Sequence, residues 1–286
     1  MKYTFRSDLL TATVDTLGAE ILSVKSNDGF EFIWNGEEWK GHAPVLFPIC
    51  GRLTEGKYTY KDKTYEMLIH GLSPYAEFKL LEQREDGVVL VLTDDEATRA
   101  KFPFSFRLTV SYKLCGNRLL ADFTVENTDS DTLPYMFGWH PGFSLGEEGE
   151  IRDYRISFTE GAALRQYPPA NGTFVSRESY PFPHGSAFDL DRSIIHRFDT
   201  VLLSGDVHYA RLHSDKSSLS VTMKTSDNLP YFAIWKMPVD SARYVCLEPW
   251  SGIPGTGSPE SFETKEMSRM APGGVEVFSY EVTLDR

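Results

Sequence analysis

Four short stretches of the sequence place an ionisable side chain among glycine, proline and apolar residues. They are residues 46–52 (LFPICGR), 69–72 (IHGL), 137–143 (FGWHPGF) and 246–250 (CLEPW). A charge buried in such surroundings is costly unless it has partners. Each ionisable residue is therefore either a satisfied structural pair or part of a functional cluster with shifted pKa values, of the kind used in acid–base chemistry. One stretch alone favours the structural interpretation, but four of the same composition favour a functional cluster.

The rest of the sequence lacks the patterns of a metal centre, a nucleotide site or a covalent nucleophile. Cys50, Cys115 and Cys246 lie far apart without C-x-x-C spacing, which predicts buried, unreactive thiols. Residues 252–257 (GIPGTG) match neither glycine-rich phosphate motif. No G-x-S-x-G pattern stands out. We therefore expect no metal and no organic cofactor.

Composition excludes several classes of protein. The 286 residues are 41% hydrophobic, which is enough for a substantial core. The 29 basic and 41 acidic residues give a net charge of −12, which disfavours binding to nucleic acid or to a membrane surface. The N-terminal residues contain no apolar segment of signal-peptide length, and no stretch approaches the roughly 20 apolar residues of a membrane span. Together with the unpaired cysteines, these features predict a cytoplasmic protein.

The elements that must position the four stretches are short alternating segments, rich in β-branched and aromatic residues. Examples are VVLVLTD, FSFRLTVSYKL, RLLADFTVEN and VEVFSYEVTL. Residues 94–101 predict a two-turn helix with an acidic start and a basic end before Pro103. Hairpin turns are predicted at residues 27–29, 61–62, 85–87, 115–117 and 214–216.

The order of these elements indicates the fold class. The strand–helix alternation of a parallel sheet is absent, so we expect one all-β domain over residues 1–286, with antiparallel strands in a sandwich. Residues 144–197 are richer in proline, glycine and charge, and are predicted to form long loops over the sheets. Four apolar residues in this region are expected to anchor the loops: Tyr154, Ile156, Phe158 and Phe174.

The sequence resembles the aldose 1-epimerases, or galactose mutarotases, and especially their LacX-like branch. The similarity covers most of the chain, and the four stretches occur in the family's order and at compatible spacing. The resemblance implies a large antiparallel β-sandwich, the galactose mutarotase-like supersandwich. It also implies an isomerase that interconverts the α and β anomers of an aldose without a cofactor.

The resemblance also implies roles for individual residues. Glu248 matches the family's catalytic base and His140 its catalytic acid. Arg52 and His70 match residues that bind the sugar, and Asp199 is the best match to an aspartate that grips sugar hydroxyls. In the implied reaction the base removes the C1 hydroxyl proton while the acid protonates the ring oxygen. Each group is expected to contribute about 10²–10⁴-fold in rate.

Other interpretations of these residues stay open. Arg52 could pair with a carboxylate such as Glu55, and His70 could cap its turn. A guanidinium stays protonated and offers several fixed donors, which suits binding better than proton transfer. Four aromatic residues are candidates to line the pocket, although core packing is favoured for each: Phe47, Trp139, Trp235 and Trp250.

Three functions fit the sequence. The first is a mutarotase for a free aldose, and the second is a mutarotase for a hexose 6-phosphate, which needs basic residues near the pocket. The third is a non-catalytic sugar-binding protein, which would be favoured had Glu248 or His140 been replaced. A glycosidase would need two carboxylates facing the bond. We favour the first, with a free or phosphorylated carbohydrate as partner and a monomer or homodimer as assembly.

Overall fold

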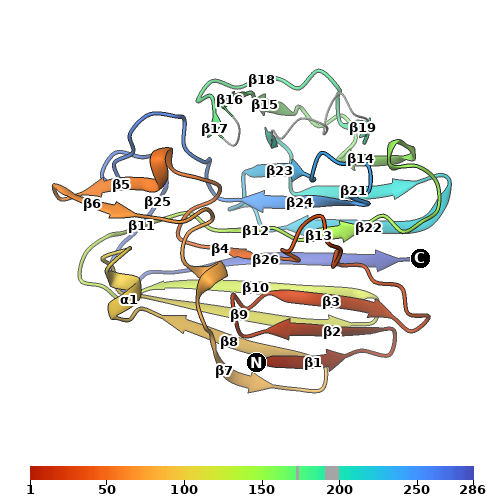
Figure 1. Ribbon diagram of the computed structural model, residues 1–286, viewed down its shortest axis with the longest axis horizontal. Coiled ribbons are helices and arrows are strands. Elements are labelled where there is room, and N and C mark those ends of the chain that lie inside the picture. Colours follow the sequence, from red (N-terminus) through yellow and green to blue (C-terminus); the bar gives the residue numbers. More distant parts are fainter. Residues whose placement is uncertain (172–173, 191–199) are drawn as a thin grey trace.

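The computed structural model describes residues 1–171, 174–190 and 200–286. These residues form β-strands almost throughout, and the strands assemble into two large antiparallel sheets and several small ones (Figure 1). The prediction of an all-β antiparallel sandwich is confirmed.

The larger sheet has nine strands, and its central strands alternate between buried and accessible residues. In β9, β10 and β26 every second side chain is buried, so one face of the sheet packs on the core and the other meets solvent. Along the sheet the order is β19 (Ala187–Asp189), β14 (Tyr154–Phe158), β21 (Tyr209–Ser214), β22 (Ser217–Thr225), β26 (Val275–Asp285), β10 (Arg118–Asn127), β9 (Phe106–Cys115), β8 (Gly87–Thr93) and β7 (Lys79–Gln83).

The second sheet has eight strands and contains β24, whose residues are all buried. A strand buried on both faces must be covered on its outer side by something other than solvent, and here loops provide that cover. The path through the sheet is β18 (Tyr180–Pro181), β15 (Arg165–Tyr167), β20 (Val201–Ser204), β23 (Tyr231–Trp235), β24 (Tyr244–Trp250), β12 (Gly138–Trp139) and β4 (Val45–Leu46), with β13 (Gly142–Ser144) also paired to β24.

Smaller elements complete the described chain. A three-stranded sheet is formed by β1 (Lys2–Arg6), β2 (Leu10–Asp15) and β3 (Ile21–Ser26). Three two-stranded ribbons pair β5 (Lys57–Tyr60) with β6 (Lys63–Glu66), β11 (Leu133–Tyr135) with β25 (Ser268–Met270), and β16 (Pro169–Asn171) with β17 (Phe174–Val175). The helical segments are α1 (Glu96–Arg99) and the 3₁₀ turns η1 (Thr54–Gly56), η2 (Ser73–Tyr75) and η3 (Ile151–Asp153).

Aromatic rings join the two large sheets. Phe137 stacks on Phe278 with ring centroids 4.7 Å apart, and Trp139 meets Tyr280 edge-on at 5.4 Å. The Tyr280 hydroxyl donates to the Pro249 carbonyl oxygen at 3.1 Å. This packing fixes the positions of β12 and β24. The side chains on the opposite face of these two strands are therefore also fixed in place.

Several local predictions can be compared with the structure. The hairpin turn at residues 61–62 is confirmed, because Lys61 and Asp62 have φ values of 45° and 59° between β5 and β6. The predicted helix at 94–101 is present as the shorter α1, which begins in a capping box at Asp95. Among the described residues, none of the helices has the length and apolarity needed to cross a membrane.

Two predictions were wrong. The described part of residues 144–197 does not consist of loops alone, because β14 adds to the nine-stranded sheet and Tyr154, Ile156 and Phe158 are core residues. Strong local charge and proline masked the short alternating pattern there. The second wrong prediction is that all three thiols are buried. Cys50 and Cys246 are buried, but Cys115 is exposed at the end of β9.

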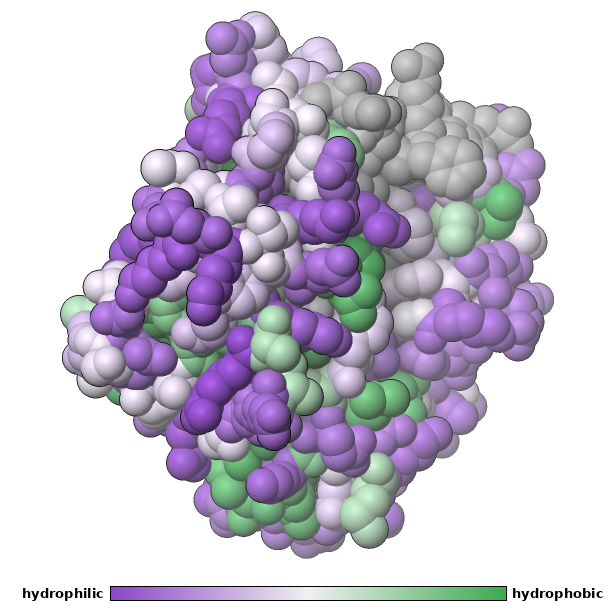
Figure 2. Space-filling model, turned by 60° about the vertical axis from the view of Figure 1, so that its left-hand side comes forward, coloured by the Kyte–Doolittle hydropathy of each residue, from purple (hydrophilic) through white to green (hydrophobic). Residues whose placement is uncertain are grey.

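The surface of the molecule is mainly polar. On the face shown in Figure 2, hydrophilic side chains predominate and the apolar ones gather only in small separate patches. The view agrees with the acidic, charge-rich composition of the chain.

Candidate active site

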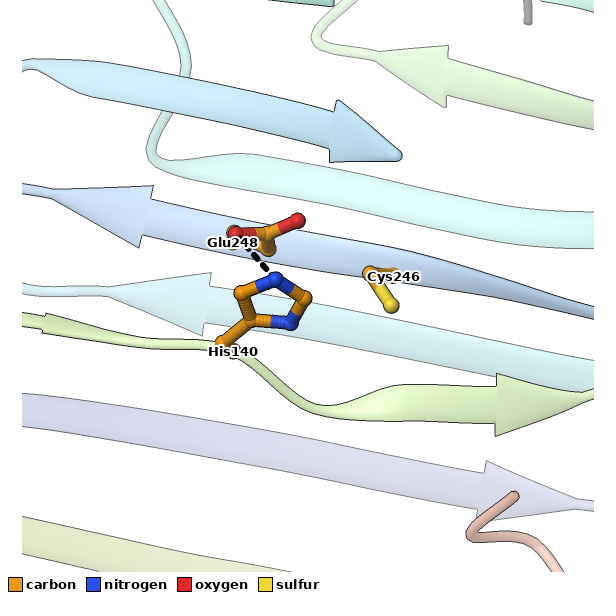
Figure 3. Close-up of side chains that lie close together, drawn as sticks. All are labelled: His140, Cys246 and Glu248. Carbon is orange, nitrogen blue, oxygen red and sulfur yellow. Dashed lines mark ion pairs between the residues drawn. The ribbon is translucent and has the colours of Figure 1, made fainter. Parts of the chain in front are cut away.

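The strand register brings Glu248 and His140 together. Glu248 lies in the middle of β24, and His140 occupies the break between β12 and β13. Gly138 pairs with Trp250 and Gly142 with Cys246, so the same antiparallel register places His140 opposite Glu248. Opposite residues in antiparallel strands project from the same face. Two side chains 108 positions apart therefore meet on the outer face of the sheet (Figure 3).

Two glycines explain the local sequence around His140. A Cβ atom at Gly138 would lie 2.5 Å from the Trp250 ring, and one at Gly142 would lie 2.8 Å from the Trp39 ring. Side chains at these two positions would displace both rings. The glycines therefore leave room on either side of His140 for aromatic walls.

Glu248 and His140 lie close together but do not satisfy one another. His140 Nε2 is 3.1 Å from Glu248 Oε2, and the two side chains are only 8% and 1% exposed. Despite this ion-pair distance, their alignment does not make a hydrogen bond, and within the described chain both Glu248 oxygens and His140 Nδ1 have no hydrogen-bond partner. Buried polar atoms are normally paired, so atoms left without a partner here suggest groups kept available for a ligand.

Burial shifts the two pKa values in opposite directions. Loss of water raises the pKa of Glu248 well above its usual value and lowers the pKa of His140 to about 3. Both shifts favour the uncharged forms. At neutral pH the imidazole of His140 is therefore uncharged, and the carboxyl group of Glu248 holds its proton more tightly than an exposed glutamate does.

Aromatic contacts, not a hydrogen bond, hold the His140 ring. Trp39 lies over it with centroids 5.0 Å apart and planes at 32°. His70 and Trp235 meet it edge-on at 5.2 and 5.8 Å. Since Nδ1 has no partner among the described residues, these three rings define the orientation that aims Nε2 at Glu248.

His70 is held by reciprocal hydrogen bonds with Gly51. The backbone N–H of His70 donates to the Gly51 carbonyl oxygen at 2.8 Å, and the Gly51 N–H donates to His70 Nδ1 at 3.1 Å. Burial, followed by the charges of His140 and Arg52, lowers the pKa of His70 well below its usual value. The ring is therefore neutral with its proton on Nε2, a hydrogen-bond donor beside the pair. His70 thus caps the turn through Nδ1, while its Nε2 can donate to a ligand.

Arg52 lies at the rim on an exposed position. Its carbonyl oxygen accepts from the Gly255 N–H at 2.8 Å, which fixes the backbone. Within the residues that the structure describes, its guanidinium forms neither an ion pair nor a hydrogen bond, so pairing with Glu55 is not observed. The charge is available to a ligand at the mouth of the site.

These groups line one cavity of about 620 Å³, a size typical of small-molecule sites. Glu248, His140, His70 and Arg52 all contribute to its wall, and Asp199 lies outside the described residues. The described residues that line the cavity are Glu20, Trp39, Lys40, Gly41, Pro44, Gly51, Arg52, Ile69, His70, Pro74, Tyr75, His140, Thr200, Trp235, Met237, Glu248 and Trp250.

The aromatic candidates divide between the cavity and the core. Trp235 and Trp250 line the cavity, whereas Phe47 and Trp139 are fully buried in the core. Sequence reasoning missed Trp39, although residues 34–44 (WNGEEWKGHAP) combine aromatics, ionisable residues, glycine and proline in the manner of the four stretches. That loop is fixed by Glu20, whose carboxylate accepts from the N–H groups of residues 42 and 43 at 2.7 and 3.0 Å.

A second buried pair, Glu260 and Lys265, fixes a loop that contacts the rim of the cavity. Lys265 Nζ donates to Glu260 Oε2 at 2.8 Å and to the Pro254 carbonyl oxygen at 3.3 Å. The other Glu260 oxygen accepts from the Thr256 N–H at 3.3 Å. This network holds the loop whose Gly255 binds the backbone of Arg52.

Comparisons with known proteins identify the family of the chain. Residues 1–263 match the protein-family model described as aldose 1-epimerase. The plasmid-encoded LacX protein of Lactococcus lactis subsp. lactis is 29% identical over 300 residues, covering 99% of both chains.

Solved structures show the same fold. A galactose mutarotase related enzyme from Lactobacillus acidophilus is 30% identical, with a TM-score of 0.92 over 99% of this chain and 97% of the other. A galactose mutarotase-like protein from Lactobacillus casei is 26% identical, with a TM-score of 0.93 over 99% and 100% of the two chains.

Proposed function

The chain belongs to the aldose 1-epimerase family, and from that premise we propose that it is a mutarotase, an isomerase that interconverts the α and β anomers of an aldose. The observation that carries the proposal is the Glu248–His140 pair. Its two groups lie 3.1 Å apart, face a cavity of about 620 Å³ and have unsatisfied polar atoms. One acid and one base so placed are sufficient for ring opening.

The reaction needs two proton transfers. Glu248 as a carboxylate takes the proton of the C1 hydroxyl, and His140 as an imidazolium gives a proton to the ring oxygen while the C1–O bond breaks. The open aldehyde rotates about C1–C2. The same groups then return the protons in the reverse directions and close the ring on the other face.

The number of protons on the pair supports this cycle. The charged form, carboxylate with imidazolium, has the same number of protons as the uncharged form that burial favours. Ring opening converts the first form into the second. The protons therefore balance within the pair during ring opening and closure, and none has to enter from solvent. Burial favours the form of the pair reached after opening and disfavours the form before it.

The neighbouring residues supply binding. His70 offers an Nε2 donor to a sugar oxygen, and Arg52 offers at the rim a guanidinium that has no ion partner among the described residues. The rings of Trp235 and Trp250 give the cavity apolar walls. Asp199 remains the proposed additional contact to sugar hydroxyls. We place this activity in the cytoplasm, in a monomer or homodimer.

A phosphorylated aldose is the second candidate substrate, because Arg52 has no ion partner in the described chain and Lys40 also lines the cavity. Freshly dissolved single anomers of free hexoses and hexose 6-phosphates separate the two candidates when their exchange is followed by polarimetry or NMR. Catalysed exchange of free sugars is expected. Absence of catalysed exchange for every sugar of both series would refute the mutarotase.

Arg52→Met sharpens the choice of substrate. We expect weaker binding or slower exchange with thermal stability nearly unchanged, whereas Arg84→Met, which removes an exposed arginine paired to Glu82, serves as the control. A much larger loss for phosphorylated than for free sugars would assign Arg52 to the phosphate. Loss of stability with normal exchange would make Arg52 a structural residue.

A further inference from the structure

A third ionisable side chain, the thiol of Cys246, lies close to the Glu248–His140 pair. Cys246 precedes Glu248 by two positions on β24, so both side chains project from the same face of the strand (Figure 3). One ligand atom each of Cys246, Glu248 and His140 lies within 4.8 Å of the other two. All three residues are buried. The proposed mutarotase reaction gives the thiol no task.

Several polar atoms of the cluster have no hydrogen-bond partner in the described chain. Both Glu248 oxygens have no hydrogen-bond partner in the described chain, although this residue is only 1% exposed. His140 Nε2 faces the carboxylate at 3.1 Å without forming an aligned hydrogen bond. Buried oxygen and nitrogen atoms that have no hydrogen-bond partner are atoms that a bound cation can satisfy.

The three ligand atoms are of a distinct chemical type. One thiol sulfur, one imidazole nitrogen and one carboxylate oxygen suit a borderline-soft divalent ion such as Zn²⁺, whereas Mg²⁺ and Ca²⁺ prefer oxygen alone. Bonds of about 2.0–2.3 Å at tetrahedral angles separate ligand atoms by roughly 3.3–3.8 Å. The nitrogen–oxygen pair is already near that separation, and the sulfur has to approach by at most about 1–1.5 Å.

From this geometry we infer that Cys246, His140 and Glu248 form a binding site for a thiophilic divalent cation. The protein supplies three ligands, and the fourth position opens into the cavity, where water completes the shell. The thiol has to release its proton to solvent when the ion binds. Because the protein supplies three ligands and a structural zinc site supplies four, we expect the affinity to be below that of a structural site.

The consequence for activity rests on the proposed function. An ion held by His140 and Glu248 occupies the lone pairs that the reaction uses for proton transfer. The ion and the sugar then exclude one another, so Zn²⁺ acts as an inhibitor competitive with the aldose. Binding of the ion itself does not depend on the protein being a mutarotase.

The test measures metal binding directly, without sugar. It uses the full chain carrying Cys115→Ser, because Cys115 is exposed and a surface thiol would bind metal on its own. Calorimetry with Zn²⁺ gives the stoichiometry and affinity. Titration with Co²⁺ reports sulfur ligation through the near-ultraviolet band of a cobalt–thiolate bond.

Cys246→Ala and Cys50→Ala form a matched pair of variants. Both thiols are fully buried and both have pKa values raised by burial and by the charge of Glu248, but only Cys246 belongs to the cluster. We expect one ion per chain and a cobalt–thiolate band in the parent and in Cys50→Ala. Cys246→Ala should lose the band and more than about 100-fold in affinity, because loss of an outer-shell partner alone costs roughly 10–100-fold.

Cys246→Ser keeps the shape of the side chain, so it replaces the alanine variant if that chain misfolds. Unchanged affinity in a folded Cys246 variant would overturn the site, as would a cobalt spectrum without a thiolate band. Exchange assays with Zn²⁺ follow separately. If the ion binds but the parent protein has no exchange activity to inhibit, the proposed function fails and the metal site stands.

Discussion

Glu260 and Lys265 form one buried acid–base pair near the cavity, and Glu248 and His140 form another at its floor. Burial is similar in both, with side-chain exposures of 3% and 2% in the first pair and 1% and 8% in the second. Their surroundings differ. The first pair has a direct 2.8 Å hydrogen bond and further bonds to the backbone at residues 254 and 256, whereas the oxygens of Glu248 have none in the described chain.

This difference separates a structural pair from a functional one. Lys265 and Glu260 compensate for their desolvation through their bonds, and the loop carrying Gly255 is fixed as a result. For Glu248 and His140, burial instead shifts both pKa values towards the uncharged forms, and their polar atoms have no partner in the described chain. Buried titratable groups with perturbed pKa values and no satisfying partner are candidates for chemistry. Substitutions in the two pairs should therefore affect different properties.

The largest effect is expected for Glu248→Gln. The amide keeps the shape of the side chain but cannot accept the C1 hydroxyl proton, so exchange should fall by about 10²–10⁴-fold while sugar binding is largely kept. NMR exchange and calorimetric binding measure the two quantities on one sample. Near-full activity in this variant would remove Glu248 as the base.

The next largest effect is expected for Lys265→Met, and it concerns stability. The substitution leaves the Glu260 carboxylate buried without its cation, which should cost about 3–5 kcal/mol in free energy of unfolding. Urea denaturation measures this loss. Exchange per folded molecule should fall far less than in Glu248→Gln.

A double variant tests the structural interpretation of that pair. Replacing both Glu260 by Leu and Lys265 by Met removes the two charges together, and should recover most of the lost stability because no charge is left unpaired. If the Lys265→Met variant were as stable as the wild type, the interpretation of Glu260 and Lys265 as a structural pair would be wrong.

A smaller effect is expected for Trp39→Ala, because Trp39 positions His140 without transferring a proton. Loss of the ring should misorient the imidazole and lower the exchange rate by about 10–100-fold. Water admitted beside His140 should also raise its pKa from about 3 towards the usual value of 6.5. The active pair carries one proton in total, so kcat/KM falls at low pH where the pair takes up a second proton. A higher pKa of His140 therefore moves this acid limb of kcat/KM to higher pH.

Trp34→Ala is the matched control. Trp34 packs on the same tyrosine as Trp39, with centroids 4.8 Å apart from Tyr244, but it does not contact His140. Its loss should lower stability similarly and leave the pH profile unchanged. Trp39→Phe should restore much of the rate. Equal pH profiles in the two alanine variants would show that Trp39 only packs.

The regular part of the fold was predictable from sequence because one face of each long strand meets water. In β9, β10 and β26 the alternation that burial imposes is visible in the residues themselves. The strands between residues 154 and 189 were missed because they are short and rich in charge or proline. Their pairing partners, such as β21 for β14, supply the structure that the local sequence does not indicate.

The site was predictable where a residue stands out within an apolar frame. Glu248, His140, His70 and Arg52 all reach the cavity from the four quoted stretches. The opposition of His140 and Glu248 depends on register across 108 positions, which only the assembled sheet sets. Trp39 lies in an irregular loop, and its contact with His140 depends on the glycine at 142, far away in sequence.

The smallest expected effect concerns stability and pH, and it has opposite signs in the two pairs. Burial raises the pKa of Glu248 in the folded protein above its usual value of 4.5. As pH rises above 4.5 the unfolded chain releases this proton while the folded chain keeps it, so the folded state loses relative stability up to its own, higher pKa. Glu248→Gln removes that penalty and should raise Tm by a few degrees at pH 7, with a smaller difference near pH 4.

Glu260→Gln, which breaks a satisfied pair, should lower Tm at pH 7. Thermal unfolding of both variants at the two pH values checks the signs, and a lower Tm for Glu248→Gln at pH 7 would mean that its carboxyl group stabilises the fold.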